Sequence, residues 1–93
     1  MMNDQQLKRA IRSIGAQCFV KHFVNFNDAT LTNDDIIERL MVEESYVETG
    51  ARTRTSSARR IIREGRSIDA LLYISESSIP QKWRNEALRL TKV

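Results

Sequence analysis

Apolar residues recur at three- and four-residue spacing along most of this 93-residue chain, and residues that break helices are rare. The sequence contains only three glycines and one proline, and turn signals such as Asn27-Asp28-Ala29-Thr30 fall between the periodic segments. A chain of this length forms one domain with one modest core, because domains span about 50–250 residues. These features predict a compact all-α fold in which residues 1–93 are a single helical domain.

We expect about five short helices, covering approximately residues 4–26, 33–45, 56–64, 68–76 and 80–91. Thr32 is a suitable N-cap for the second helix, and Pro80 fits the start of the last one. Gly65 fits the end of the third helix. Gly15 lies inside the first pattern, where a close helix crossing would explain it. The phenylalanine-rich end of that segment, FVKHFVNF, is also compatible with a short strand.

Charge is segregated along the chain, although the formal net charge is only +3. Residues 1–26 carry a net +3, residues 27–51 carry −6, residues 52–66 carry +5 and residues 67–93 carry +1. The basic block at 52–66 uses arginine only, and the planar guanidinium group suits phosphate oxygens and guanine edges. An acidic block directly precedes it. Pairing of the two blocks, within one chain or between subunits, is therefore the alternative interpretation.

The arginine block is expected to form one face of the third helix. On a helical wheel four arginines share one sector, with two further polar residues beside them: Arg52, Arg59, Arg63 and Arg66, flanked by Ser56 and Arg60. Ala58, Ile61 and Ile62 lie on the opposite side. A broad basic face with short hydroxyl groups is typical of a helix that lies along a phosphate backbone or in the major groove.

The segment Ser57-Ala58-Arg59-Arg60-Ile61-Ile62-Arg63-Glu64-Gly65 resembles the second, base-reading helix of helix-turn-helix DNA-binding domains. In that family a Ser or Thr is followed by a small or branched apolar residue, two often basic residues, an apolar residue and a glycine stop. The resemblance covers about nine residues of 93. In the family the preceding helix usually ends three or four residues upstream. The sequence departs from this pattern, because the second predicted helix ends near Ser45 and about ten residues intervene. Either Tyr46–Ala51 forms a short extra helix, or the geometry is not that of a standard helix-turn-helix.

The resemblance implies that five residues face DNA: Ser56, Ser57, Arg59, Arg60 and Arg63. We further expect Arg52, Arg54 and Arg66 to bind phosphates and hold the register. Thr53 or Thr55 is a candidate cap of this helix, and the Thr55 hydroxyl is expected to bind another phosphate.

We therefore predict a small, sequence-dependent protein that binds double-stranded DNA and regulates transcription as a homodimer. The homodimer is expected because one short helix contacts only a few base pairs, and a two-fold pair doubles the contacts. The long first helix, with Phe19, Phe23 and Phe26, is the predicted dimer contact, and the last helix is the second choice.

Two other functions stay open. The chain could be a non-catalytic protein-interaction module, an adaptor or inhibitor, that works through its acidic second helix, or the basic helix could bind RNA. The aromatic residues do not interleave with the arginines, which disfavours recognition of single strands by stacking.

Neither an enzyme nor a cofactor-binding protein is expected. The sequence has no glycine-rich phosphate loop, and it offers no Ser-His-Asp or Cys-His arrangement for nucleophilic catalysis, so we expect no small-molecule substrate either. Cys18 and His22 are four residues apart, but two ligands do not make a metal site, and no other Cys or His exists. We therefore expect no metal.

The longest apolar run, Ala70–Ile74, is far shorter than a membrane span, which needs about 18 residues. The polar start lacks the apolar core of a secretory signal. With a single cysteine, no internal disulfide can form, and the expected location is the cytoplasm, without a membrane partner.

Overall fold

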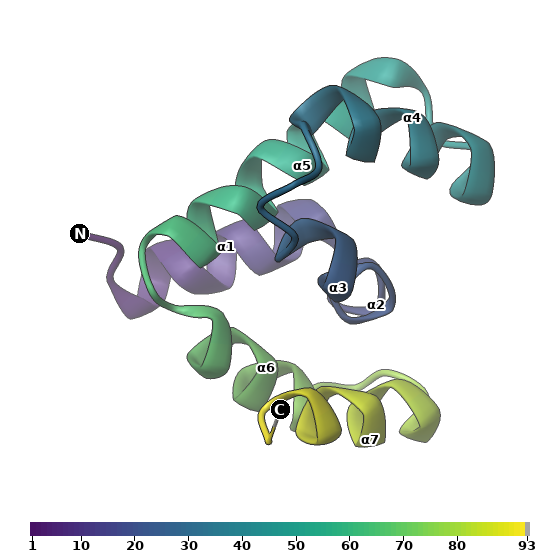
Figure 1. Ribbon diagram of the computed structural model, residues 1–93. Coiled ribbons are helices and arrows are strands. Elements are labelled where there is room, and N and C mark those ends of the chain that lie inside the picture. Colours follow the sequence, from purple (N-terminus) through teal and green to yellow (C-terminus); the bar gives the residue numbers. More distant parts are fainter. Residues whose placement is uncertain (93) are drawn as a thin grey trace.

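In the computed structural model, which describes residues 1–92, the chain forms helices joined by short turns (Figure 1). The helices of these residues are α1 (Asp4–Ile14), α2 (Ala16–Lys21), α3 (Phe23–Phe26), α4 (Asn33–Glu44), α5 (Glu48–Arg63), α6 (Ser67–Ser75) and α7 (Gln81–Leu90). The all-α class is confirmed. The number of helices is seven within the described residues rather than about five, because the first predicted helix is divided into α1, α2 and α3. The segment 19–26 is helical, with no strand.

Gly15 makes the first of these divisions. Its φ of +91° lies in a region that favours glycine, because a Cβ atom there is strained. A Cβ atom on Gly15 would also lie only 3.3 Å from Nη1 of Arg54, which approaches from α5. Gly15 is therefore approached by a side chain of α5, and it lies at the break between α1 and α2 rather than inside one helix at a helix crossing.

Local capping explains where several helices begin. The Thr32 hydroxyl accepts a hydrogen bond from the backbone N–H of Asp35, whose carboxylate in turn accepts from the N–H of Thr32, so the predicted N-cap of α4 is confirmed. Asn3 and Gln6 form the same reciprocal arrangement at the start of α1. Pro80 directly precedes α7, as predicted.

Helix α5 is longer than predicted. It begins at Glu48, so Tyr46–Ala51 does not form a separate helix, and Thr53 and Thr55 lie inside α5 rather than capping it. Only Ser45, Tyr46 and Val47 separate α4 from α5, and Ser45 adopts a left-handed conformation with φ of 59°. The buried residues in the first half of α5 are small or polar, which is why apolar periodicity does not reveal it: Ala51, Thr55 and Ala58.

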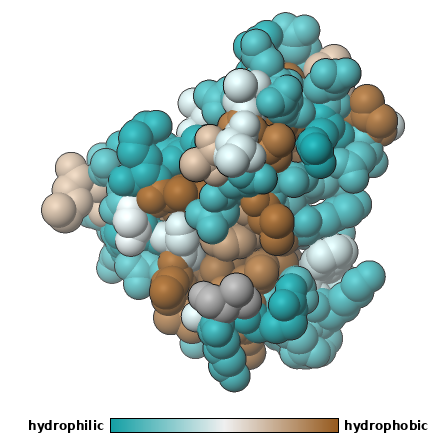
Figure 2. Space-filling model, viewed as in Figure 1, coloured by the Kyte–Doolittle hydropathy of each residue, from teal (hydrophilic) through white to brown (hydrophobic). Residues whose placement is uncertain are grey.

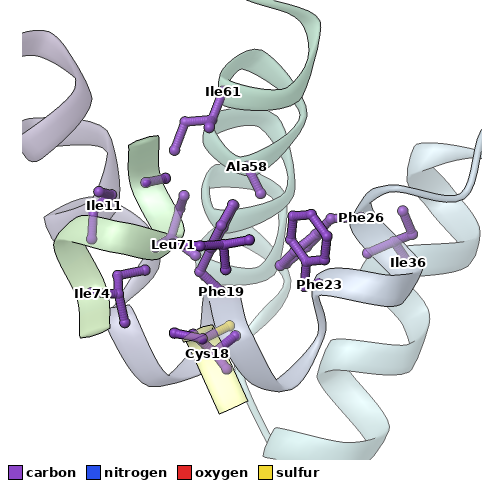
Figure 3. Close-up of a cluster of buried hydrophobic side chains, with 14 of the residues drawn as sticks. Ile11, Cys18, Phe19, Phe23, Phe26, Ile36, Ala58, Ile61, Leu71 and Ile74 are labelled. Carbon is purple, nitrogen blue, oxygen red and sulfur yellow. The ribbon is translucent and has the colours of Figure 1, made fainter. Parts of the chain in front are cut away.

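Helix α5 runs through the middle of the fold, packed along α1 on one side and α4 on another, while α6 and α7 pair with each other beside them (Figure 1). The core between these layers contains fully buried Phe19, Phe26 and Ile61 (Figure 3). The ring of Phe19 stacks on Phe26 at 6.1 Å and meets Phe23 edge-on at 5.5 Å. The prediction that these phenylalanines form a dimer contact is wrong, because all three are buried within one chain.

Candidate nucleic-acid interface

The residues predicted to contact DNA do not share one exposed surface. Arg60, Arg63 and Ser56 are exposed, and Ser57 is half-buried. Neither Arg60 nor Arg63 takes part in an ion pair or a side-chain hydrogen bond within residues 1–92, so both guanidinium groups are available to an anion. The other five predicted residues have partners in the fold or are buried.

Arg54 holds α5 against the end of α1. Its guanidinium group lies 4.0 Å from the ring centroid of Tyr46, a cation–π contact, and donates a hydrogen bond to the carbonyl oxygen of Ile14. That carbonyl is one of the last in α1, where helix carbonyls lack a partner within the helix. Arg54 is therefore engaged by a helix end that lies 40 residues earlier in the sequence.

Arg59 is engaged in a similar way by the turn before α4. Its Nη2 atom donates to the carbonyl oxygen of Leu31 at 2.8 Å and to that of Asp28 at 3.2 Å. Its Nε atom is buried. The side chain therefore links the middle of α5 to the turn that precedes α4.

Arg66 fastens the beginning of the chain to the start of α6. It donates to the carbonyl oxygen of Met2 at 2.6 Å and binds the carboxylates of Asp4 at 2.6 Å and Asp69 at 2.7 Å. The hydrogen bonds to Asp4 and Asp69 raise the pKa of the Arg66 guanidinium. Three partners in the fold leave this side chain little capacity for phosphate.

Arg52 and Thr55 complete the set. Arg52 is exposed, but it binds Glu48 at 3.1 Å and lies 3.7 Å from Asp34, so its charge is balanced by acidic neighbours. Thr55 is 1% exposed and faces the core. The Thr55 hydroxyl is therefore out of reach of an external phosphate.

Helix α1 supplies basic residues that the sequence interpretation did not include in the site. A shallow groove between α1 and α5 is lined by Gln6, Arg9, Ala10, Ser13, Ser57 and Arg60. Arg9 and Arg60 thus meet over one groove, although they are 51 positions apart in the sequence. Arg12 is exposed on the same helix as Arg9, and neither has an ion-pair partner in the part of the chain that the structure describes.

We define the basic face as the arginines Arg9, Arg12, Arg60 and Arg63 together with the hydroxyl residues Ser13 and Ser57. A signal for its α1 part was present in the sequence, since residues 1–26 carry a net +3 and their cations lie mostly off the apolar stripe. Only the packing of α1 beside α5 brings Arg9 of the first helix to the same groove as Arg60 of the second.

Cys18 and His22 lie in the core and not at a surface. The Cys18 thiol has a raised pKa because it is buried. Nε2 of His22 lies 2.8 Å from the Glu44 carboxylate, which also binds Lys21 at 2.6 Å. Within residues 1–92, no cluster of three or more His, Cys, Asp or Glu side chains is arranged to hold a metal ion.

Comparisons with protein-family models, with curated proteins and with solved structures find no match for this chain. Over residues 1–92, no helix has the length and apolar character needed to cross a membrane.

Proposed function

We propose that this protein is a non-catalytic module that binds double-stranded DNA through its basic face, mainly by contacts to the phosphate backbone. The observation that carries this proposal is the set of four exposed arginines from α1 and α5, none of which has an ion-pair partner within residues 1–92. Guanidinium groups make charge-assisted, often bidentate hydrogen bonds to phosphate, and Ser13 and Ser57 add hydroxyl donors between them.

The charge around α5 favours one end of this helix for the contact. Near its start, Arg52 is flanked by Glu48 and Asp34, and acidic side chains repel phosphate. Toward its end, Arg60 shares a groove with Arg9 of α1, and Arg63 follows Arg60 on the exposed surface of α5. DNA is therefore expected to lie across α1 and the second half of α5, rather than to receive the whole of α5 in its major groove.

Sequence-dependent recognition, regulation of transcription and a homodimer remain predictions within this proposal. A second copy on the same duplex would double the number of phosphates bound. Because the basic face spans only two short helices, such doubling would lengthen the site and strengthen the binding.

The test measures binding of a fluorescently labelled DNA duplex by anisotropy as a function of salt. If the four arginines each bind a phosphate, log K should fall with log salt at a slope of about −3.6, which is about a 150-fold loss of affinity between about 50 and 200 mM salt. The double variant Arg60→Gln, Arg63→Gln should reduce the slope to about −1.8 and the loss to about 12-fold.

A matched control removes the same charge elsewhere. Lys82 and Arg89 are exposed on α7, so Lys82→Gln, Arg89→Gln should leave the slope unchanged. Equal effects of the two double variants would show that only net charge matters. Absence of any duplex binding at low salt would refute the proposal, and tighter binding to an RNA duplex of the same sequence would replace DNA by RNA.

A further inference from the structure

The outer side of α4 carries an open groove that the proposed function does not use. It is lined by Leu31, Asp35, Glu38, Arg39, Val42 and Glu43. Val42 is 76% exposed, so an apolar side chain lies uncovered among three carboxylates and one guanidinium group. We call these six residues the acidic groove.

Two of the three carboxylates in the acidic groove, those of Glu38 and Glu43, differ from other acidic side chains nearby, whereas the third, Asp35, accepts a hydrogen bond from the N–H of Thr32. Glu44 binds Lys21 at 2.6 Å, and Glu48 binds Arg52 at 3.1 Å. Glu38 and Glu43, in contrast, are exposed and form no ion pair with any residue of the described chain. Val42 lies between them on the helix surface, because at about 100° per residue it is rotated about 40° from Glu38 and about 100° from Glu43.

This arrangement suits an arginine side chain better than a small cation. The aliphatic stem can cover the apolar surface of Val42 and Leu31, while the guanidinium group reaches the carboxylates at the edges. The basic face presents four such arginine side chains, which are exposed and have no ion-pair partner within residues 1–92.

We propose that the acidic groove of one copy binds the basic face of a second copy. Within one copy the acidic groove does not contact the basic face. The α5 arginine near an acidic residue of α4 is Arg52, at 3.7 Å from Asp34, and Arg60 and Arg63 lie two and three turns further along α5. The complementary charges therefore meet between copies.

This proposal uses the same arginines as the proposed DNA site, so the two bound states exclude each other. A duplex that covers the basic face displaces the acidic groove bound there, so two copies on one duplex would not be joined by this contact. A high concentration of protein without DNA favours the assembly. Because the paired groups are exposed, the contact weakens as salt screens the charges, over a Debye length of about 10 Å at 0.1 M.

The experiment measures assembly by sedimentation velocity without DNA, at about 50 and 300 mM salt, between which the Debye length falls about 2.4-fold. We expect a concentration-dependent species larger than the monomer at low salt and monomer at high salt. Glu38→Gln, Glu43→Gln should weaken the assembly about tenfold. Glu76→Gln, which removes an exposed carboxylate from the end of α6, should leave it unchanged.

A charge exchange makes the test specific. The variant Glu38→Arg, Glu43→Arg and the variant Arg60→Glu, Arg63→Glu should each be monomeric alone, and their mixture should assemble again. A monomeric wild-type protein at low salt, or a mixture that stays monomeric while the wild-type protein assembles, would overturn the proposal.

The assembly experiment can fail or succeed independently of the DNA-binding experiment. Glu38→Gln, Glu43→Gln retains the basic face, so it should still bind the duplex with the full salt slope. Loss of assembly with intact DNA binding supports both proposals, and assembly without any DNA binding supports this one alone.

Discussion

Replacing Arg59 by methionine should destabilise the fold, although this residue belongs to the arginine block that the sequence assigns to DNA. Methionine keeps an apolar stem and removes the guanidinium group, whose Nη2 atom donates to the carbonyl oxygens of Leu31 and Asp28 at 2.8 and 3.2 Å. A hydrogen bond from a charged donor contributes about 1.5–3 kcal/mol, and the longer of these two is the weaker. We expect the free energy of unfolding to fall by about 3 kcal/mol.

For a domain of this size that loss lowers the midpoint of thermal unfolding by about 12–24 °C. The assay is urea and thermal unfolding followed by far-ultraviolet circular dichroism. Arg63→Met is the matched control, because Arg63 lies one turn further along α5, is exposed and has no ion pair within residues 1–92. Its effect should stay within about 0.5 kcal/mol.

The result that would refute the reasoning is equal unfolding of the two variants with unchanged urea dependence. In that case the carbonyl contacts would contribute nothing, and Arg59 would be as free for an external anion as the sequence alone predicts. A lower midpoint for Arg59→Met only would confirm that this side chain is a structural link between α5 and the turn before α4.

Two further predictions concern pH and the backbone. Hydrogen bonds from Lys21 and His22 hold the pKa of Glu44 below its ordinary value of 4.5, so the contribution of Glu44 to stability should be complete above about pH 4.5 and disappear as the pH falls through the lowered pKa. In urea unfolding, the free energy of unfolding of Glu44→Gln should therefore be lower than that of the wild type at pH 7 and approach it in acid. A difference between the two proteins that is constant with pH would contradict this. Gly15→Ala should destabilise by about 1–3 kcal/mol because φ is +91° and Arg54 Nη1 is 3.3 Å from the new Cβ atom. Gly50→Ala, inside α5 with only an ordinary contact at 3.8 Å, should instead stabilise by about 0.5–1 kcal/mol, and thermal unfolding that ranks these two glycine variants in the opposite order would contradict the argument.

The fold could be predicted where local chemistry decides it. The capping residue Thr32 and the position of Pro80 mark helix starts through interactions among near neighbours. The start of α5 could not be predicted in this way, since Ala51 and Thr55 are its buried residues there, and small or polar side chains leave no apolar periodicity. The break at Gly15 was likewise hidden, because a glycine inside a periodic segment is also compatible with one continuous helix.

The candidate site, too, could be predicted only in part from the sequence. The helical wheel places Arg59 and Arg63 in one sector, and both could contact DNA if the helix were alone. In the folded chain the carbonyl oxygens near Asp28 and Leu31 accept hydrogen bonds from Arg59 and not from Arg63. Backbone acceptors on another element have no signature in the sequence around the arginine, so the wheel cannot distinguish the two residues.

By itself, the sequence determined the all-helical class and the segregation of charge into basic and acidic segments, because spacing, capping and composition act over a few residues. The tertiary structure alone decided which arginines remain available to a partner. Hydrogen bonds from Arg54 and Arg59 to carbonyl groups 40 and 28 residues away, and the meeting of Arg9 with Arg60, arise only when α1 and the turn before α4 pack against α5.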